Sequence, residues 1–175
     1  RSVDTNVLKK EHENPSGYTC QNNILKRASP GHIFKTDVVQ IRFLDANLRN
    51  GNIALSVLYG LLEGISRYLD IERDEISGCL QWYYNPKLTE GNYSLIIFDT
   101  TPGGAGHVRR IDGKDDLEGV LQKSLMLVKS CNCGGEEGDS SCYSCLRNYY
   151  NQRQHDLLKR SYVVDFIENN FVKHS

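Results

Sequence analysis

The hydrophobic positions change period along the chain, and each change predicts an element. Residues 37–44 are rich in β-branched and aromatic side chains, which favours a strand. From Asn52 onward the apolar side chains recur at helical spacing and predict an amphipathic helix with a wide buried stripe: Ala54, Val57, Leu58, Leu61, Leu62, Ile65 and Leu69. Gly60 and Gly64 lie on a neighbouring face of that helix, where they would let another element approach closely.

Two further strands are predicted at 76–84 and 93–99, and the second has the continuous apolar run of a buried strand. The segment between them contains Asn, Pro and Gly, so we expect a hairpin-like loop and antiparallel neighbours. A second helix, built on Leu117, Val120, Leu121, Leu125 and Val128, leads to a cluster of cysteines. Short helical pieces are expected at 146–150 and 155–159, and Ser161 is expected to cap a last helix that runs through Phe171.

This order of elements predicts an α/β domain. We expect a small mixed sheet in strand–helix–strand–strand–helix order, flanked by helices, with a C-terminal four-cysteine zinc lobe. Residues 1–30 show no period and are interpreted as a linker or N-terminal arm, 31–130 as the α/β core, and 131–175 as the zinc lobe with C-terminal helices. Because the first residue is Arg1 rather than Met, we expect the chain to be part of a longer protein.

Composition narrows the possible classes of protein. The chain is 39% hydrophobic and 25% charged, as in ordinary globular proteins, and its net charge is -1. A strongly basic nucleic-acid module is therefore excluded, and any cationic surface must be local. No apolar run reaches the roughly 18 residues that a membrane span requires, so we expect no membrane partner.

Four of the six cysteines fall in one short stretch with the spacing of metal ligands. Cys131 and Cys133 are separated from Cys142 and Cys145 by a polar, glycine-rich segment that lets the second pair fold back on the first. Two such pairs supply the four thiolates of a tetrahedral Zn²⁺ site, which leaves no open position and so predicts one structural zinc ion. An iron–sulfur cluster also takes four cysteines, and Cys142-x-x-Cys145 has redox spacing, so both alternatives stay open.

The cysteine pattern also indicates a compartment. A disulfide framework requires a cysteine-dense secreted chain, whereas clustered metal spacing favours a reducing cytoplasm, which we expect to be bacterial. Cys79 lies in an apolar strand and is predicted to be a buried small hydrophobe.

A glycine turn follows the last predicted strand, with Pro102, Gly103, Gly104 and Gly106 as its structural residues. Its position before a helical segment suggests an anion site. It lacks the Gly-Lys-Ser/Thr ending of a nucleotide loop, so a turn for close packing is favoured.

The segment after the cysteines is locally cationic and carries interleaved aromatic residues. Such a pattern suits a nucleic-acid backbone with base stacking, and a solvated helix face is the alternative. The candidate nucleic-acid-binding residues are Arg147, Tyr149, Arg153, His155, Lys159 and Arg160.

No catalytic residues are assigned to this chain. It contains neither a Gly-x-Ser-x-Gly elbow nor the His-x-Lys of phospholipase-D-like nucleases. A nuclease remnant stays open as an alternative, because His32, Asp37 and Asp99 could converge in space.

Several motifs together resemble one known family over about residues 30–170. They are Gly31-His32 with Thr36-Asp37, Leu62-Glu63-Gly64, Asp99-Thr-Thr-Pro-Gly-Gly-Ala-Gly106, Cys131-x-Cys133, Cys142-x-x-Cys145-Leu-Arg147, Tyr149, Asn151-Gln152, His155-Asp156 and Leu158. The chain is identified by them as similar to the MrfA-type zinc-binding domain, a four-cysteine C-terminal domain of superfamily-2 DEAD/DEAH-box DNA helicases that was formerly a domain of unknown function.

The resemblance implies the C-terminal accessory domain of an ATP-dependent 3′-to-5′ DNA repair helicase. Its expected partners are DNA, single-stranded or at a junction, and the motor domains in cis. Such a domain would stabilise the helicase C-terminal region and contribute to DNA binding or strand separation. The family's zinc ligands carry over onto the four clustered cysteines. Related domains occur in bacterial anti-phage systems, so a protein-interaction domain of a defence complex is the alternative.

Overall fold

The fold is that of a computed structural model, which describes residues 13, 16–19, 33–86 and 90–171. The chain divides into two compact units, 1–33 and 34–175. In the first, Glu13 and Thr19 form an isolated antiparallel bridge. The second unit holds the clustered cysteines and is described below. Within the described ranges, no helix has both the length and the apolar character needed to cross a bilayer.

The sheet has three strands, β1 (Val38–Ile41), β2 (Ile76–Asn85) and β3 (Glu90–Asp99), in the order β1-β3-β2. β2 and β3 form the expected antiparallel hairpin, and β1 is also antiparallel to β3. The sheet is therefore antiparallel throughout instead of mixed, since both neighbours of the central strand β3 run opposite to it.

β1 is shorter than the predicted strand, and a buried side chain explains where it stops. The amide nitrogen of Asn92 donates hydrogen bonds to the carbonyls of Phe43 and Asp45, at 3.4 and 2.9 Å. These carbonyls are thus bonded by a side chain of β3 instead of a strand ladder. The chain then turns into a short 3-10 helix, η1 (Ala46–Arg49).

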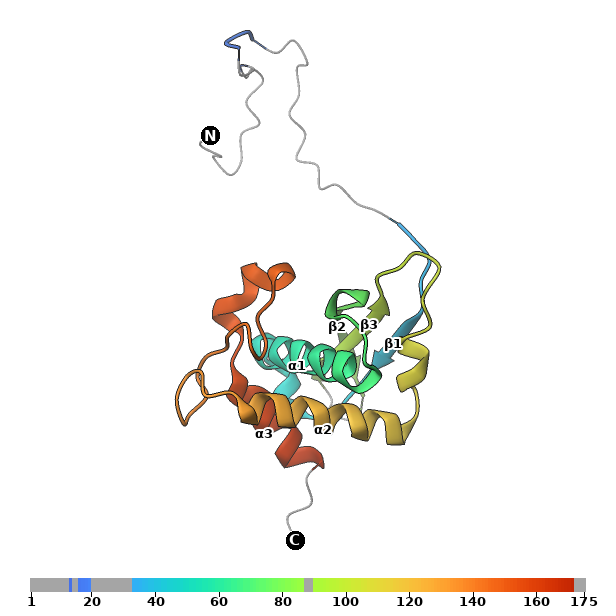
Figure 1. Ribbon diagram of the computed structural model, residues 1–175, viewed down its shortest axis with the longest axis vertical. Helices are drawn as coiled ribbons and strands as arrows, with labels where there is room; N and C mark the ends of the chain where they lie inside the picture. Colours follow the sequence, from blue (N-terminus) through green and yellow to red (C-terminus); the bar gives the residue numbers. More distant parts are fainter. Residues whose placement is uncertain (1–12, 14–15, 20–32, 87–89, 172–175) are drawn as a thin grey trace. The chain divides into compact units, whose positions relative to one another are not determined.

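In the part of the chain that the structure describes, three α-helices build the layers beside the sheet: α1 (Gly51–Leu69), α2 (Lys114–Ser130) and α3 (Arg160–Phe171). α1 packs against the sheet and also contacts α2 and α3, so it is the centre of the unit (Figure 1). Three further 3-10 helices connect these elements: η2 (Arg73–Glu75), η3 (Val108–Ile111) and η4 (Tyr149–Leu157). The predicted α/β class, with a small sheet, flanking helices and a four-cysteine lobe, is confirmed.

The two glycines of α1 do allow close approach, as predicted. A Cβ at Gly60 would lie 2.8 Å from Val163 of α3, and one at Gly64 would lie 1.9 Å from the Ser124 hydroxyl of α2. Both distances are shorter than van der Waals contact, so each helix crosses α1 at a glycine. The largest fully buried side chains line these interfaces and the sheet: Leu48, Leu58, Leu61, Leu62, Ile65, Ile76, Leu95, Ile97, Leu146, Leu158 and Ile167.

Three local predictions are wrong. Cys79 is exposed because it alternates with Gly78, which faces Leu58 and Leu62 of α1, and so points to the opposite face of the sheet. Ser161 is not a cap, since α3 already begins at Arg160. The two short helical pieces do form as 3-10 helices, but their predicted bounds are wrong: both lie within η4 (Tyr149–Leu157) and meet at Asn151, whose backbone is not helical.

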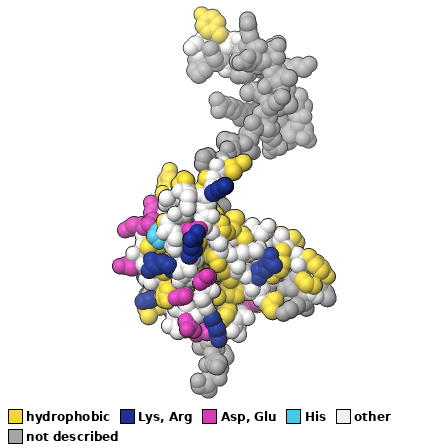
Figure 2. Space-filling view, turned by 90° about the vertical axis from the view of Figure 1, so that its right-hand side faces the viewer, with side chains coloured by type: hydrophobic (Ala, Val, Ile, Leu, Met, Phe, Trp, Pro, Cys, Tyr) yellow, Lys and Arg dark blue, Asp and Glu magenta, His cyan; other side chains and the backbone are white. Residues whose placement is uncertain are grey.

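The surface charge is mixed. On the face seen in Figure 2, Lys and Arg side chains are interspersed with Asp and Glu, with hydrophobic side chains between them. This face therefore has no continuous cationic surface, in agreement with the net charge of -1.

Candidate metal centre

The first cysteine pair is delivered by the end of α2. Cys131 is the residue directly after the last helical position, and its extended backbone (φ −94°, ψ 134°) turns Cys133 back toward it. The chain then reverses through three glycines with left-handed backbone: Gly134 (φ 74°), Gly135 (φ 66°) and Gly138 (φ 63°). A side chain at Gly134 would also strike the backbone of Asp139 and Ser140. These positions therefore require glycine.

The second pair forms a tight turn around one carbonyl. The carbonyl of Cys142 accepts hydrogen bonds from the backbone N–H groups of Cys145, Leu146 and Arg147, at 3.0–3.1 Å. The N–H of Cys142 donates to Sγ of Cys145 (3.2 Å), and the N–H of Ser144 donates to Sγ of Cys142 (3.4 Å). Such donors stabilise negative charge on sulfur, which suits thiolate ligands.

The four sulfur atoms form a compact group whose spacing is close to that of a tetrahedral zinc site. Sγ of Cys131 lies 3.4 Å from that of Cys133 and 3.5 Å from that of Cys142. Sγ of Cys145 lies 3.6 Å from that of Cys133 and 3.9 Å from that of Cys142, and all four sulfurs lie within 4.8 Å of one another. Zinc–thiolate bonds of about 2.3 Å place tetrahedral sulfurs about 3.8 Å apart. The donor set and its spacing therefore fit one Zn²⁺ ion.

The same spacing argues against the two alternative interpretations. An iron–sulfur cluster would hold the cysteine sulfurs farther apart, because its own iron and sulfide atoms lie between them. A redox Cys-x-x-Cys pair begins an α-helix, whereas Cys142 and Cys145 lie in a turn with two further thiols in contact.

Protonation of the metal-free thiols is uneven. Burial raises the pKa of the Cys133 and Cys145 thiols. Burial acts in the same direction on Cys142, but the N–H of Ser144 and the neighbouring thiols outweigh it and lower the pKa of Cys142 to about 7. Cys142 is thus more ready than Cys133 or Cys145 to meet a metal ion as the thiolate.

The buried side chain of Arg160 holds the backbone of the zinc lobe together. It is 9% exposed, and its guanidinium donates hydrogen bonds to the carbonyls of Cys133 (3.2 Å), Gly135 (2.5 Å) and Val128 (3.4 Å). Its backbone N–H also donates to the carbonyl of Ser140, at 3.0 Å. Arg160 therefore ties the start of α3 to the end of α2 and to the loop between the cysteine pairs.

A buried asparagine organises the chain after the last cysteine. Asn151 is fully buried, and its amide nitrogen donates to the carbonyl of Leu146 at 2.8 Å. Its Oδ1 accepts from the N–H of Asn148 (2.8 Å) and lies 2.9 Å from Nε2 of His155. Nε2 of His155 also lies 3.1 Å from the carbonyl of Asn148, which assigns the proton to Nε2. Sequence reasoning missed this network, although Asn148 and Asn151 have the spacing of a capping box.

Two contacts fasten the lobe to α1. Glu63 of α1 pairs with Arg73 at 3.0 Å, and its carboxyl group also lies close to the Asn148 side chain. Burial raises the pKa of Glu63, and Arg73 and Asn148 oppose that shift. Farther along, the N–H of Lys159 donates to the buried hydroxyl of Ser56, at 3.1 Å. The lobe is therefore an integral part of the packed unit.

The structure divides the predicted nucleic-acid-binding residues into two groups. Arg160 and His155 are engaged within the lobe, as described, and Lys159 pairs with Asp139 at 2.7 Å. Tyr149 is 75% exposed, and Arg153 is also exposed. Arg147 is half-buried, with its Nε donating to the hydroxyl of Ser141 at 3.0 Å. Arg147, Tyr149 and Arg153 thus keep the most surface for a ligand.

The glycine turn encloses a carboxylate of the chain itself. Oδ2 of the fully buried Asp99 accepts from the N–H groups of Ala105, Gly106 and His107, at 2.8, 2.7 and 3.1 Å. Its Oδ1 accepts from the N–H of Val108 at 3.1 Å. The turn does bind an anion, but the anion is Asp99, so a phosphate is not needed there. The structural role predicted for Pro102–Gly106 fits this arrangement.

The contacts of Asp37 and Asp99 do not support the alternative of a nuclease remnant. Asp37 and Asp99 do lie together, since the N–H of Asp99 donates to the carbonyl of Asp37 at 3.2 Å. However, Asp99 is occupied by four backbone donors and Asp37 pairs with Arg109. His32 lies outside the described residues.

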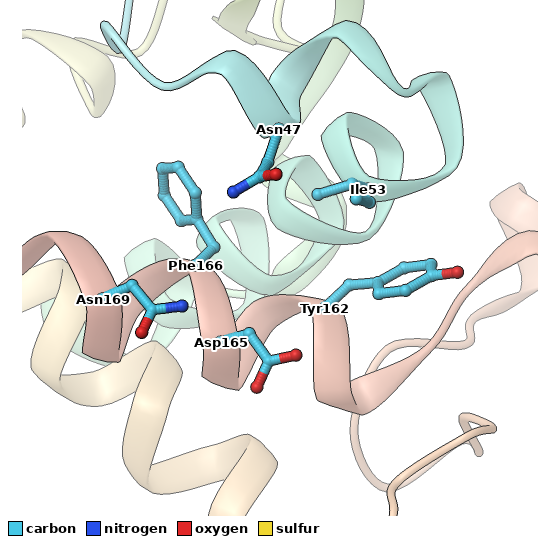
Figure 3. Close-up of a pocket in the computed structure, with 6 residues that line it drawn as sticks. All are labelled: Asn47, Ile53, Tyr162, Asp165, Phe166 and Asn169. Atoms are coloured by element: carbon cyan, nitrogen blue, oxygen red, sulfur yellow. The ribbon is translucent and has the colours of Figure 1, made fainter.

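One shallow pocket lies apart from the cysteines, between η1, the start of α1 and α3 (Figure 3). It holds about 230 Å³ and is lined by Asn47, Ile53, Tyr162, Asp165, Phe166 and Asn169. This volume lies below the roughly 300–1,000 Å³ of small-molecule sites. A second hollow, of about 370 Å³, lies between β1 and the segment that joins η3 to α2, and it is open to solvent. The four-cysteine cluster is nevertheless the candidate functional site, because its donor set can hold a metal ion.

A closed set of four thiols on the edge of an α/β unit defines the class as a domain with a zinc-binding lobe. Residues 57–146, which contain all four cysteines, match the family described as the MrfA Zn-binding domain (MZB). The chain belongs to this family. Zinc is accordingly its metal, and the four-cysteine cluster is able to hold it.

Two similar proteins are much longer than this chain. The Druantia protein DruE of Escherichia coli (strain UMEA 4076-1) is 28% identical over 149 residues, which cover 77% of this chain and 8% of DruE. The crystal structure of the DUF1998 helicase MrfA bound to DNA matches with a TM-score of 0.47 and 14% identity, over 75% of this chain and 16% of that one. The chain thus spans less than a fifth of either protein.

Proposed function

We propose that this chain is the zinc-stabilised accessory domain of an ATP-dependent DNA repair helicase. In this role it stabilises the C-terminal region of the parent chain and contributes to DNA binding or strand separation. ATP binding and hydrolysis belong to motor domains elsewhere in the parent chain. Membership of the MrfA Zn-binding family supports the proposal.

The observation that carries the proposal is the compact group of four sulfurs, which begins at Cys131 directly after α2. In our proposal, Cys131, Cys133, Cys142 and Cys145 are the ligands of one Zn²⁺ ion. A zinc ion with four protein ligands has no position for substrate, so the ion acts as a scaffold. What it supports is the segment from Arg147 to Arg160, which begins two residues after the last cysteine.

DNA contact in this proposal rests on Arg147 and Arg153, because the other cations of the segment are engaged internally. Glu136 and Glu137 of the same lobe are exposed, and their carboxylates would repel DNA phosphates. The DNA contact is therefore confined to the surface around the two arginines. Two phosphate contacts predict a weak complex whose log affinity falls with log salt at a slope of about −1.4 for a single strand.

The experiment is fluorescence anisotropy of labelled DNA with the zinc-loaded 175-residue chain, titrated at several salt concentrations. Arg147→Ala or Arg153→Ala should weaken binding and reduce the steepness of the salt slope by about 0.7 each. Arg110→Ala removes an exposed arginine of η3 and serves as the matched control. If the folded chain does not bind DNA even at low salt, the DNA-contact part of the proposal is wrong.

The second candidate is a protein-interaction domain of a bacterial anti-phage defence complex. The similarity to the Druantia protein DruE favours it. Under this proposal the folded chain ignores DNA, and the zinc lobe docks another chain. In either case we propose a place in the cytoplasm, where reducing conditions keep zinc-binding thiols free of disulfides.

A further inference from the structure

Three strongly exposed tyrosines lie on the zinc lobe, and we call them the tyrosine patch. Tyr143 is 67% exposed, Tyr149 75% and Tyr150 74%. The rings of Tyr149 and Tyr150 meet edge to face, with centroids 5.7 Å apart and planes at 86°. Tyr143 meets the ring of His155 in the same way, at 5.4 Å and 89°. In each pair the edge of one ring covers one face of the other, and the high exposure of all three tyrosines leaves the remaining ring surface open to solvent.

The backbone beneath the patch is fixed before any ligand arrives. Oδ1 of Asn148 accepts from the N–H groups of Tyr150 and Asn151, at 2.9 and 3.1 Å, and so caps the start of η4. His155 links Tyr143 to the segment that carries Tyr149 and Tyr150. Its ring packs on Tyr143, and its Nε2 forms a hydrogen bond with the carbonyl of Asn148. Cys145 is followed directly by the fully buried Leu146, so the zinc knuckle anchors the same segment to the core.

Two arginines lie close to the tyrosines in the sequence. Arg147 precedes Tyr149 by two residues, and among the described residues the structure records only the Ser141 hydroxyl as a hydrogen-bond partner of its guanidinium. Arg153 lies farther along η4 and is exposed. Aromatic faces next to guanidinium groups are the chemistry that proteins use to bind bases and phosphates of one strand together.

We propose that the tyrosine patch binds unpaired bases, so that the domain prefers single-stranded over double-stranded nucleic acid. In a duplex the base faces are covered by their neighbours, whereas the bases of a single strand can stack on an exposed ring. Arg147 and Arg153 contact the phosphates of the same strand. This inference deepens the proposed function and rests on its DNA-contact part.

The test compares a labelled oligothymidylate with a duplex of the same length, using the zinc-loaded 175-residue chain. The single strand should bind more tightly.

Tyr149→Ala or Tyr150→Ala should weaken single-strand binding about fivefold or more while leaving duplex binding and the salt slope unchanged. Tyr149→Phe and Tyr150→Phe keep the ring and should bind within about twofold of the unchanged chain. Tyr84→Ala, which removes a tyrosine 66% exposed on β2, is the matched control. Zinc content and circular dichroism verify that each variant is folded.

The outcomes separate this inference from the proposed function. If Arg147→Ala and Arg153→Ala weaken binding but the tyrosine-to-alanine variants do not, the tyrosine patch is not a base-stacking site and the proposed DNA contact stands. Equal affinity for single strand and duplex also overturns the inference. If the folded chain binds neither nucleic acid at low salt, the DNA-contact proposal itself fails, and a protein partner for the patch is favoured.

Discussion

Replacing Arg160 with Met removes the internal cation of the zinc lobe and keeps an unbranched side chain. The guanidinium donates to the carbonyls of Cys133 and Gly135, at 3.2 and 2.5 Å, and more weakly to that of Val128 at 3.4 Å. Hydrogen bonds to charged groups contribute about 1.5–3 kcal/mol each, so the loss of the two shorter bonds destabilises the lobe by about 3 kcal/mol. Because these carbonyls lie beside and between the zinc ligands, we expect zinc affinity to fall by roughly a hundredfold.

The assay is competition for zinc against a chromophoric chelator, together with guanidinium unfolding of the zinc-loaded chain. Arg153→Met is the matched control, since Arg153 is an exposed arginine of the same lobe, and its effect on stability should stay within about 0.5 kcal/mol. The reasoning is refuted if Arg160→Met binds zinc as tightly as Arg153→Met. A variant that keeps its zinc affinity but loses DNA binding would instead restore Arg160 as a nucleic-acid contact.

Three further predictions concern the metal, the glycine turn and the link to α1. Chelation of zinc should unravel residues 129–160 first while the sheet keeps its protection, which hydrogen exchange measures; uniform loss of protection would contradict it. In Asp99→Asn, one of the four backbone N–H donors faces an amide NH₂, so the free energy of unfolding should fall by about 3 kcal/mol. Denaturant titration measures this, and an unchanged midpoint would contradict the role of Asp99 in holding the glycine turn. Burial raises the pKa of the Glu63 carboxyl group above its ordinary 4.5, so the folded chain binds the carboxyl proton more tightly than the unfolded chain does. The stability that this proton contributes is lost as the pH rises through the pKa of Glu63 in the folded chain. Glu63→Gln should abolish that component when the two unfolding curves are compared across this pH range, and identical pH dependence in both chains would contradict it.

Periodicity predicted most of the core because burial imposes it directly. The apolar stripe of α1 and the glycines at Gly60 and Gly64 reflect packing against the sheet, α2 and α3. The hairpin of β2 and β3 was readable from a short polar loop between two strands. In contrast, the end of β1 depends on Asn92, which reaches the carbonyls of Phe43 and Asp45 from another strand. A local pattern does not contain such a long-range contact.

The clustering of the four cysteines was predictable from the sequence, but the residues that surround them were not. The spacing of four cysteines is a strong signal, because close thiol pairs have few other uses in a reducing compartment. Composition could not distinguish Arg160 from Arg153, since the two arginines differ only in what the fold places around them. One is buried among carbonyls, and the other is exposed on η4. The glycine turn was a reasonable candidate for an anion site, because its backbone N–H groups do bind a carboxylate. That carboxylate belongs to Asp99, which precedes Gly106 by seven residues.

The central claim is that Cys131, Cys133, Cys142 and Cys145 hold one structural zinc ion. X-ray absorption at the zinc edge of the purified chain tests it most directly. The account predicts one zinc per chain with four sulfur neighbours at about 2.3 Å and no oxygen or nitrogen ligand. Fewer than four sulfur neighbours, a light-atom ligand in the zinc shell, or iron in place of zinc would contradict it.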